Sequence, residues 1–489
     1  MLMLQNRNKD PFYGVLIRQI IQKTLPEKVL KAIQDSSEEL GCPVYVVGGY
    51  VRDIFLGRPS SDIDLVTQGP GSGIALAKKI HAKLGKQANI AVFKSFGTAA
   101  ISIKGFEIEI VGARKESYRA NSRNPIVEDG SFYDDQLRRD FTINALSISL
   151  NKESFGNLVD PFDGLSDLRK RIIRTPLDPD ETFSDDPLRM MRAIRFASQL
   201  QFEIPKDILS SITVNASRIQ IVAIERITEE FLKIMASEKP SVGLSLMEVT
   251  GIMQYVFPEI LELKRVETID GRGHKDNFEH TLQVVDRIAP QTDNIYLRLA
   301  ALFHDIAKPV TKRYEKGKGW TFHNHNFIGA RMIPKIFKRV KLPLNDKMKY
   351  VQKLVDLHMR PATLAEEGIS DSAIRRLLFD AGDDIEDLMT LCEADITSKN
   401  QQKVTECMEN FSFVRQRLKE IEEKDRIRNF QPPLTGKDIM DIFGLEPGAK
   451  IGELKSAVKD AILDGRISND RASAEKYLHE CAKLLGIES

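Results

Sequence analysis

The spacing of apolar residues changes near residue 165 and separates two kinds of structure. Before that point, short β-branched runs alternate with segments in which apolar residues recur every three or four positions. We expect strands at 44–47, from 62 onward, and at 91–93, 98–103 and 107–111, with helices over 15–40, 50–56 and 73–84. Helical spacing dominates from residue 166 to the end. The pattern predicts an α+β protein, in which a small α/β domain is followed by helices.

Polar groups collect around the first two predicted strands. Gly48 and Gly49 end the first strand, and their backbone N–H groups can approach a phosphate beside the N-terminus of the next helix. Asp62 and Asp64 flank Ile63 at the start of the second strand. Side chains at i and i+2 of a strand share one face, so the two carboxylates project together. Paired carboxylates suit Mg²⁺, which also bridges substrate phosphates.

The order of these residues is more specific than any one of them. GGYVRDIFLG followed by DID resembles the head-domain signature of class II tRNA nucleotidyltransferases and bacterial poly(A) polymerases. The resemblance implies a polymerase-β-like nucleotidyltransferase head in which Asp62 and Asp64 hold two Mg²⁺ ions. It also implies that Gly48, Gly49 and Arg52 contact the nucleotide. The expected substrates are CTP, ATP and the 3′ end of tRNA.

A third carboxylate is expected near this pair. Glu109 lies in the predicted strand FEIEIVG, which could run beside the strand of Asp62 and Asp64. The resemblance implies that Glu109 faces the metal pair, and a solvent-facing strand glutamate is the alternative.

Residues 114–135 are polar, charged and rich in turn formers, which predicts a long mobile loop. In the family that the head resembles, a flexible loop here is implicated in the switch from C to A addition. Its presence therefore favours an enzyme that adds the full CCA sequence.

A second motif, RRDFTINAL, covers residues 138–146. Arg139 could hold a triphosphate oxygen through paired N–H donors, and Asp140 could accept from a ribose hydroxyl. By itself, such a sequence is typical of a helix cap with a surface charge pair. After the first motif, it matches the family segment implicated in ribose recognition.

A helix is predicted to begin at Asp185-Asp186-Pro187, and it places charged residues at every third position, namely Asp186, Arg189, Arg192 and Arg195. An amphipathic helix with a basic solvent face is the simplest interpretation. The family resemblance implies instead that Asp186 and Arg189 form hydrogen bonds with the edge of cytosine or adenine, while Arg192 and Arg195 bind phosphates. Asp185 stands where the family commonly has glutamate, which leaves the role of this first acid open.

Histidines are concentrated in the second half, where six of the eight fall between His274 and His358. Their order with aspartates, H…HD…H…H…D, resembles the HD phosphohydrolase domain. The implied ligands of a divalent or transition metal are His280, His304, Asp305, His325, His358 and Asp395. The alternative is a helical body that binds tRNA and has lost its metal. A basic run over 330–353 is a candidate phosphate-binding stripe, or else a solvated helix face.

Composition adds few constraints. The 71 basic and 70 acidic residues nearly cancel, so nucleic-acid binding cannot be argued from overall charge. The four cysteines form no CxxC pair, which argues against a zinc ribbon or a disulfide framework. We find no signal peptide and no run long enough to span a bilayer, so a cytoplasmic protein without membrane contact is expected.

These observations predict five segments: a helical arm (1–34), the nucleotidyltransferase head (35–165), an all-α neck that recognises the base (166–235), a helical body (236–420) with the HD domain at about 276–395, and a helical tail (421–489) that holds the tRNA elbow. The expected function is CCA addition to tRNA. Alternatives are a poly(A) polymerase, an enzyme that adds only CC or only A, an HD phosphohydrolase with a vestigial head, and a non-catalytic tRNA-binding protein. The sequence leaves the oligomeric state open.

Overall fold

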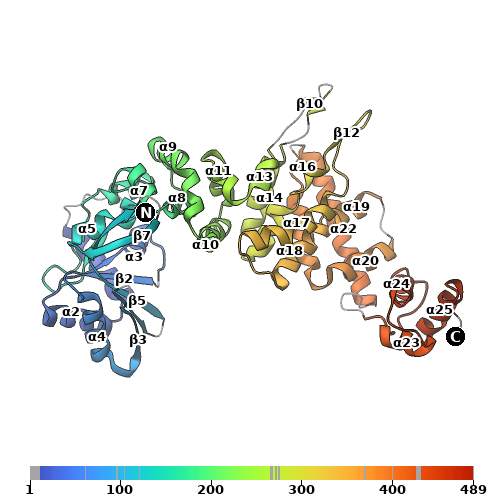
Figure 1. Cartoon of the computed structure of the whole chain (residues 1–489), viewed down its shortest axis with the longest axis horizontal. Coiled ribbons are helices and arrows are strands. Elements are labelled where there is room, and N and C mark those ends of the chain that lie inside the picture. The colour runs from blue at the N-terminus through green and yellow to red at the C-terminus, as the bar shows by residue number, and fades with distance from the viewer. Residues whose placement is uncertain are drawn as a thin grey trace. The chain divides into compact units, whose positions relative to one another are not determined.

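A computed structural model describes residues 11–60, 62–94, 97–103, 105–119, 122–264, 268–269, 272–273, 276–367, 370–398, 400–425 and 431–487. The chain divides into two compact units, Met1–Val256 and Phe257–Ser489, and each is described by itself (Figure 1).

The first unit contains a seven-stranded sheet in the order β3-β4-β5-β2-β1-β8-β9. Its strands are β1 (Val44–Val47), β2 (Asp62–Thr67), β3 (Ala88–Phe93), β4 (Thr98–Ile103), β5 (Phe106–Gly112), β8 (Ser147–Ser149) and β9 (Leu158–Val159). All neighbours pair antiparallel except β2 and β5, which are parallel. The strands expected from the sequence are confirmed. Because Ile63 and Leu65 are buried and alternate with Asp62 and Asp64, one face of β2 packs inward and the other carries the carboxylates.

Helices cover the sheet and continue beyond it. They are α1 (Pro11–Thr24), α2 (Glu27–Leu40), α3 (Gly49–Leu56), α4 (Ser72–Leu84), α5 (Phe132–Leu137), α6 (Gly164–Lys170), α7 (Pro179–Asp185), α8 (Leu188–Leu200), α9 (Lys206–Asn215), α10 (Ile224–Met235), α11 (Pro240–Val249) and α12 (Met253–Val256). Helix α4 packs on β3, β4 and β5, and α8 packs on α10 and α11 (Figure 1). Met190, Met191 and Ile194 of α8 are fully buried, so α8 is the central helix of the group that it forms with α10 and α11.

The prediction of a long mobile loop over residues 114–135 is wrong. Strands β6 (Arg114–Arg119) and β7 (Ser122–Asp129) form an antiparallel hairpin, and α5 follows it. The charges that suggested a loop instead support the pairing, since Arg114 lies opposite Asp129 and Lys115 opposite Glu128. Opposite charges across a strand pair stabilise a sheet even where both faces are solvated.

Among the residues that the structure describes, the second unit is helical apart from two short hairpins. Its helices are α13 (Pro258–Glu262), α14 (Asn277–Ile288), α15 (Ile295–Phe303), α16 (Lys308–Thr311), α17 (His325–Arg339), α18 (Asp346–Leu357), α19 (Met359–Glu367), α20 (Asp371–Ala381), α21 (Ile385–Asp395), α22 (Gln401–Asp425), α23 (Gly436–Phe443), α24 (Ala449–Leu463) and α25 (Arg471–Leu484). The hairpins are β10 (Thr268–Ile269) with β11 (Arg272–Gly273), and β12 (Arg313–Glu315) with β13 (Gly319–Thr321). The predicted α+β class is therefore confirmed. Within the described ranges, no helix combines the length and apolar character needed to cross a membrane.

Candidate functional site

Four carboxylates lie together on one face of the paired strands β2 and β5. The parallel register sets Asp64 directly opposite Glu109, and Asp62 opposite Glu107. Asp64 is the most enclosed of these carboxylates, since Asp62, Glu107 and Glu109 are exposed. Burial raises the pKa of Asp64, Arg139 opposes this effect, and the negative charges of Glu109 and Asp62 add to it, so that the pKa lies at about 6. Acidic groups that repel one another in this way favour a bound cation.

The turn after β1 brings the backbone against this acidic group. Gly48 has a φ of 76°, and a Cβ atom at this position would lie 3.3 Å from Oδ2 of Asp64 and 3.4 Å from Nη1 of Arg139. A side chain would therefore be strained and would crowd both groups. Gly49 begins α3 directly beside them.

Arg139 is held by an acidic residue that the sequence analysis missed. Asp135 of α5 is fully buried, and its Oδ2 accepts from Nη2 of Arg139 at 3.0 Å. Arg138 donates to the other oxygen through Nε at 3.0 Å. Burial alone would raise the pKa of Asp135, but Arg139 and Arg138 hold it below its usual range. The i, i+4 spacing of Asp135 and Arg139 was the available signal.

Asp140 joins the head to α8. Its Oδ2 accepts from Nε of Arg192 at 2.7 Å, and its Oδ1 accepts from the backbone N–H of Phe141 at 2.8 Å and Nδ2 of Asn144 at 3.0 Å. Burial would raise the pKa of Asp140, yet the charge of Arg192 and these hydrogen bonds lower it to about 2. Asn144 also accepts from Nη1 of Arg52 at 2.9 Å. The sequence analysis did not single out Asn144.

Arg189 and Arg195 of α8, and Asp186 in the link between α7 and α8, also contact the protein. Nη2 of Arg189 donates to the carbonyl oxygen of Arg138 at 2.7 Å, and Oδ1 of Asp186 accepts from the N–H of Leu188 at 3.2 Å. Arg195 forms an ion pair of 2.7 Å with the buried Glu230. Because these side chains contact the protein, they do not form the basic solvent-exposed face that was the simplest interpretation of the sequence.

Three arginine side chains lie around the phenyl ring of Phe196, between the head and α8. Arg52, Arg192 and Arg195 place their guanidinium carbons 4.9, 5.5 and 4.0 Å from the ring centre of Phe196. The first unit thus brings Asp62, Asp64, Glu109, Gly48 and Arg139 into one group, and Arg52, Asp140 and Arg192 into an adjoining one. Arg195 lies at the far end beside Glu230, and its predicted contact with a phosphate stays a prediction.

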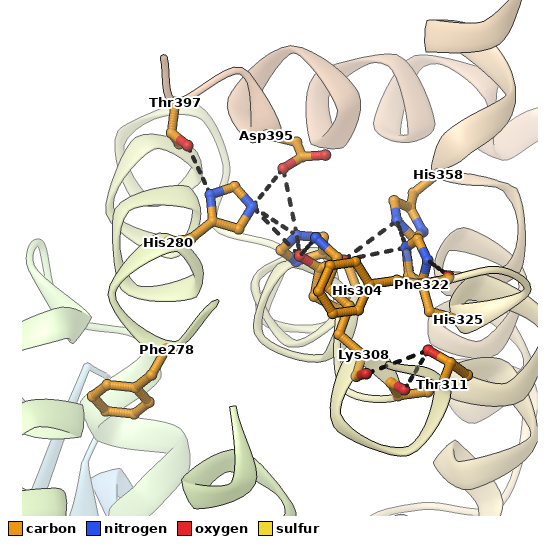
Figure 2. A network of polar contacts seen from close by, with 12 residues as sticks. Phe278, His280, His304, Lys308, Thr311, Phe322, His325, His358, Asp395 and Thr397 are labelled. Carbon is orange, nitrogen blue, oxygen red and sulfur yellow. Dashed lines mark hydrogen bonds and ion pairs between the residues drawn. The ribbon is translucent and has the colours of Figure 1, made fainter. Parts of the chain in front are cut away.

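The second unit brings all six predicted metal ligands together (Figure 2). They form two groups, His280 with His304 and Asp395, and Asp305 with His325 and His358. We call these six residues the histidine–aspartate cluster. Asp305 lies between the groups, since its Oδ2 is 3.2 Å from Nε2 of His304 and its Oδ1 is 3.3 Å from Nε2 of His325.

The imidazole rings are oriented by the backbone. Nδ1 of His304, His325 and His358 lies 2.7, 2.8 and 2.7 Å from the carbonyl oxygen three residues earlier. A carbonyl oxygen only accepts, so Nδ1 carries a proton in each ring and Nε2 faces the cluster. Burial lowers the pKa of His304, but the charges of Asp305 and Asp395 outweigh burial and raise this pKa to about 10, so a bound cation would replace the proton on Nε2 of His304.

The resulting arrangement fits a bound metal. Nε2 of His325 and Nε2 of His358 are 3.3 Å apart, and two lone pairs at this distance repel unless a cation or a proton lies between them. Burial lowers the pKa of His358 to about 4, which opposes the proton. Buried imidazoles and carboxylates with fixed tautomers are typical ligands of divalent and transition metals.

Three family models match successive parts of the chain. The model of the poly(A) polymerase head domain matches residues 44–174. A segment described as the probable RNA and SrmB-binding site of polymerase A matches 201–263, and the HD domain matches 277–400.

Whole-chain relatives carry two different names. An A-adding tRNA nucleotidyltransferase of Deinococcus radiodurans is 28% identical over 89% of this chain and 95% of its own length. A CCA-adding enzyme of Levilactobacillus brevis is 29% identical over 91% of this chain and 96% of its own. The crystal structure of the Bacillus stearothermophilus CCA-adding enzyme in complex with CTP shares the fold, with a TM-score of 0.65 and 22% identity over 94% of this chain and 98% of that one.

Proposed function

We propose that this chain, which belongs to the family of tRNA nucleotidyltransferases and bacterial poly(A) polymerases, adds CCA to tRNA 3′ ends from CTP and ATP. The observation that carries the proposal is the group of Asp62, Asp64 and Glu109 on paired strands, facing Arg139 and the Gly48 turn. This group combines cation ligands with donors for a triphosphate in one place.

The acidic residues would hold Mg²⁺. Asp62 and Asp64 offer carboxylate oxygens on one strand face, and Glu109 adds a third across the register. When bound, Mg²⁺ would supply Lewis-acid activation of the tRNA 3′-hydroxyl and neutralise charge on the departing pyrophosphate. The protein positions these ligands, and Gly48 leaves the space beside Asp64 open because glycine has no side chain.

The nucleotide would lie between the head and α8. Arg139 is proposed to bind the triphosphate together with the Gly48–Gly49 backbone, and Asp140 to bind the ribose. Asp186 and Arg189 are proposed to read the base: a carboxylate accepts from the exocyclic amino group that cytosine and adenine share, and a guanidinium donates to ring acceptors. The contacts of these residues with the protein would have to be exchanged for contacts with the nucleotide.

The segment that forms the hairpin β6–β7 favours full CCA addition over addition of CC alone, because the family has its loop implicated in the switch from C to A at this position. The relatives do not separate full CCA addition from addition of A alone, since A-adding and CCA-adding enzymes match to nearly the same extent.

The test is incorporation of labelled CTP and ATP, separately and together, into tRNA transcripts ending before CCA, after C and after CC. Two C residues followed by one A support the proposal. A lengthening A tail indicates a poly(A) polymerase, and addition of only C or only A indicates a divided activity. If the protein binds tRNA but incorporates neither nucleotide, it is a tRNA-binding protein and the proposed enzymatic activity is refuted.

A matched pair of variants tests the acidic group. Glu109→Gln should reduce incorporation far more than Glu107→Gln, because both glutamates are exposed on the same strand face and only Glu109 lies opposite Asp64. Equal effects of the two substitutions would contradict the role of Glu109.

We propose metal-dependent phosphoester hydrolysis at the histidine–aspartate cluster as a second function. It is supported by the convergence of four imidazoles and two carboxylates with oriented tautomers. A bound metal would supply an activated water for hydrolysis. Calorimetric titration of the full chain with Mn²⁺ tests this function: a component of the binding that His304→Ala removes supports it, and identical titrations of the unmodified chain and His304→Ala refute it.

A further inference from the structure

A lysine touches the histidine–aspartate cluster. Lys308, the first residue of α16, places Nζ 2.5 Å from Oδ2 of Asp305. The same oxygen lies 3.2 Å from Nε2 of His304 and 3.5 Å from Nε2 of His280. An ammonium group at this oxygen and a cation held by His280 and His304 would therefore compete for it.

Lys308 also lies at the edge of the cluster. Its side chain is 20% exposed, whereas that of Asp305 is 2% exposed. The Phe322 ring centre is 5.7 Å from Nζ, and the Phe322 carbonyl oxygen accepts from His325, so this aromatic residue is anchored to the cluster beside the lysine. In Figure 2, the Phe322 ring overlaps His304 in this view, and Lys308 is drawn below His304. The lysine can therefore face the buried ligands and a molecule arriving from solvent.

We propose that Lys308 binds a phosphoryl oxygen of the substrate at this cluster, after a cation has replaced it at Asp305. The inference rests on the metal-dependent function proposed above. An ammonium group has three donors on a flexible stem, so it can leave one oxyanion for another within reach of its side chain. The alternative is a structural ion pair, in which Lys308 only neutralises the buried carboxylate.

The two roles differ in what a phosphate ion does. Removing Lys308 takes a competing positive charge from Asp305, so Mn²⁺ should bind Lys308→Met at least as tightly as the unmodified chain. Inorganic phosphate should bind the Mn²⁺-loaded variant about 10- to 100-fold more weakly, which is the loss expected for one hydrogen bond from a charged donor. Lys308→Arg keeps the charge and should retain most of the phosphate affinity. A structural ion pair predicts no change in phosphate affinity.

The experiment is calorimetry on the full-length chain, first with Mn²⁺ and then with inorganic phosphate. Lys312→Met is the matched control, because that ammonium lies 5.3 Å from the Trp320 ring centre, and its variant should bind both probes as the unmodified chain does. Circular dichroism checks that each variant is folded.

The outcomes separate the two hypotheses. Phosphate affinity equal to that of the unmodified chain in Lys308→Met overturns the role of Lys308 and leaves the metal function intact. Loss of Mn²⁺ binding in a folded Lys308→Met variant also overturns it, since the lysine would then support the ligands. If the unmodified chain and His304→Ala bind Mn²⁺ identically, the metal function is refuted, and this inference with it.

Discussion

Replacing Asp140 with asparagine is expected to weaken the attachment of α8 to the head by about 1–2 kcal/mol at neutral pH. The pKa of Asp140 falls from 3.8 to about 2 on folding, and this difference corresponds to about 2.5 kcal/mol in favour of the ionised form. Arg192 is 34% exposed and regains hydration when its partner is removed, which reduces the cost. Asparagine keeps the size of the side chain, so packing changes little.

The sign of the pH dependence follows from the lowered pKa. The stabilisation is complete above the unfolded pKa near 4, and it is lost as the pH falls through the folded pKa near 2. About half of it should remain at pH 3. The asparagine side chain of the variant cannot titrate, so the difference between the unmodified chain and Asp140→Asn should shrink on acidification.

Hydrogen exchange of peptides from α8, corrected for intrinsic rates, measures this local stability at pH 7 and pH 3. A double-mutant cycle with Arg192→Met isolates the ion pair, and a coupling of about 1 kcal/mol or more is expected. A difference that stays constant or grows between pH 7 and pH 3 would refute the reasoning.

Three further substitutions test other contacts. Gly48→Ala forces a residue with a Cβ atom to adopt a backbone φ of 76° beside Asp64. The substitution should lower the free energy of unfolding by about 1–2 kcal/mol and reduce CTP incorporation. Normal incorporation would contradict the close approach of Gly48 to Asp64. Phe196→Leu removes the ring that Arg52 and Arg195 contact, and increased hydrogen exchange in α8, by about 1–2 kcal/mol, is expected. Arg376→Met breaks ion pairs with Asp464 and Asp460 that hold α24 on α20, but all three side chains are well exposed. Exchange in α24 should therefore rise by at most about 1 kcal/mol, and less in 1 M salt.

The strands of the head could be predicted because burial on one face leaves a period-two pattern in the sequence. Ile63 and Leu65 alternate with Asp62 and Asp64, and the same alternation runs through Ile108 and Glu109. The hairpin β6–β7 was missed because its strands lack this alternation of apolar and polar residues. It belongs to a separate two-stranded sheet rather than the main one, and the Arg114–Asp129 pair lies across strands that no apolar alternation reveals.

The histidine–aspartate cluster was predictable as a set because the order of its histidines and aspartates along the chain resembles that of the HD domain. Its internal arrangement was not. The central place of Asp305 depends on how α14, α15, α17 and α21 pack. The contact with Lys308 is local, because Lys308 and Asp305 are three residues apart, and that of Asp135 with Arg139 spans four residues. Asn144 and Glu230 were missed because their contacts with Arg52 and Arg195 join residues that are far apart in the sequence.

These partners change the interpretation of the nucleotide site. A carboxylate offers about four acceptor positions, and those of Asp140 are all used: Oδ1 accepts from Phe141 and Asn144, and Oδ2 lies 2.7 Å from Nε and 2.6 Å from Nη2 of Arg192. A ribose hydroxyl can bind Asp140 only if one of these donors moves. Arg192 is the donor with the most exposed side chain, and it is also the residue proposed to bind phosphate. Ribose binding at Asp140 and phosphate binding by Arg192 would therefore occur together. A nucleotide would break the ion pair that joins the head to α8 and would bind both residues.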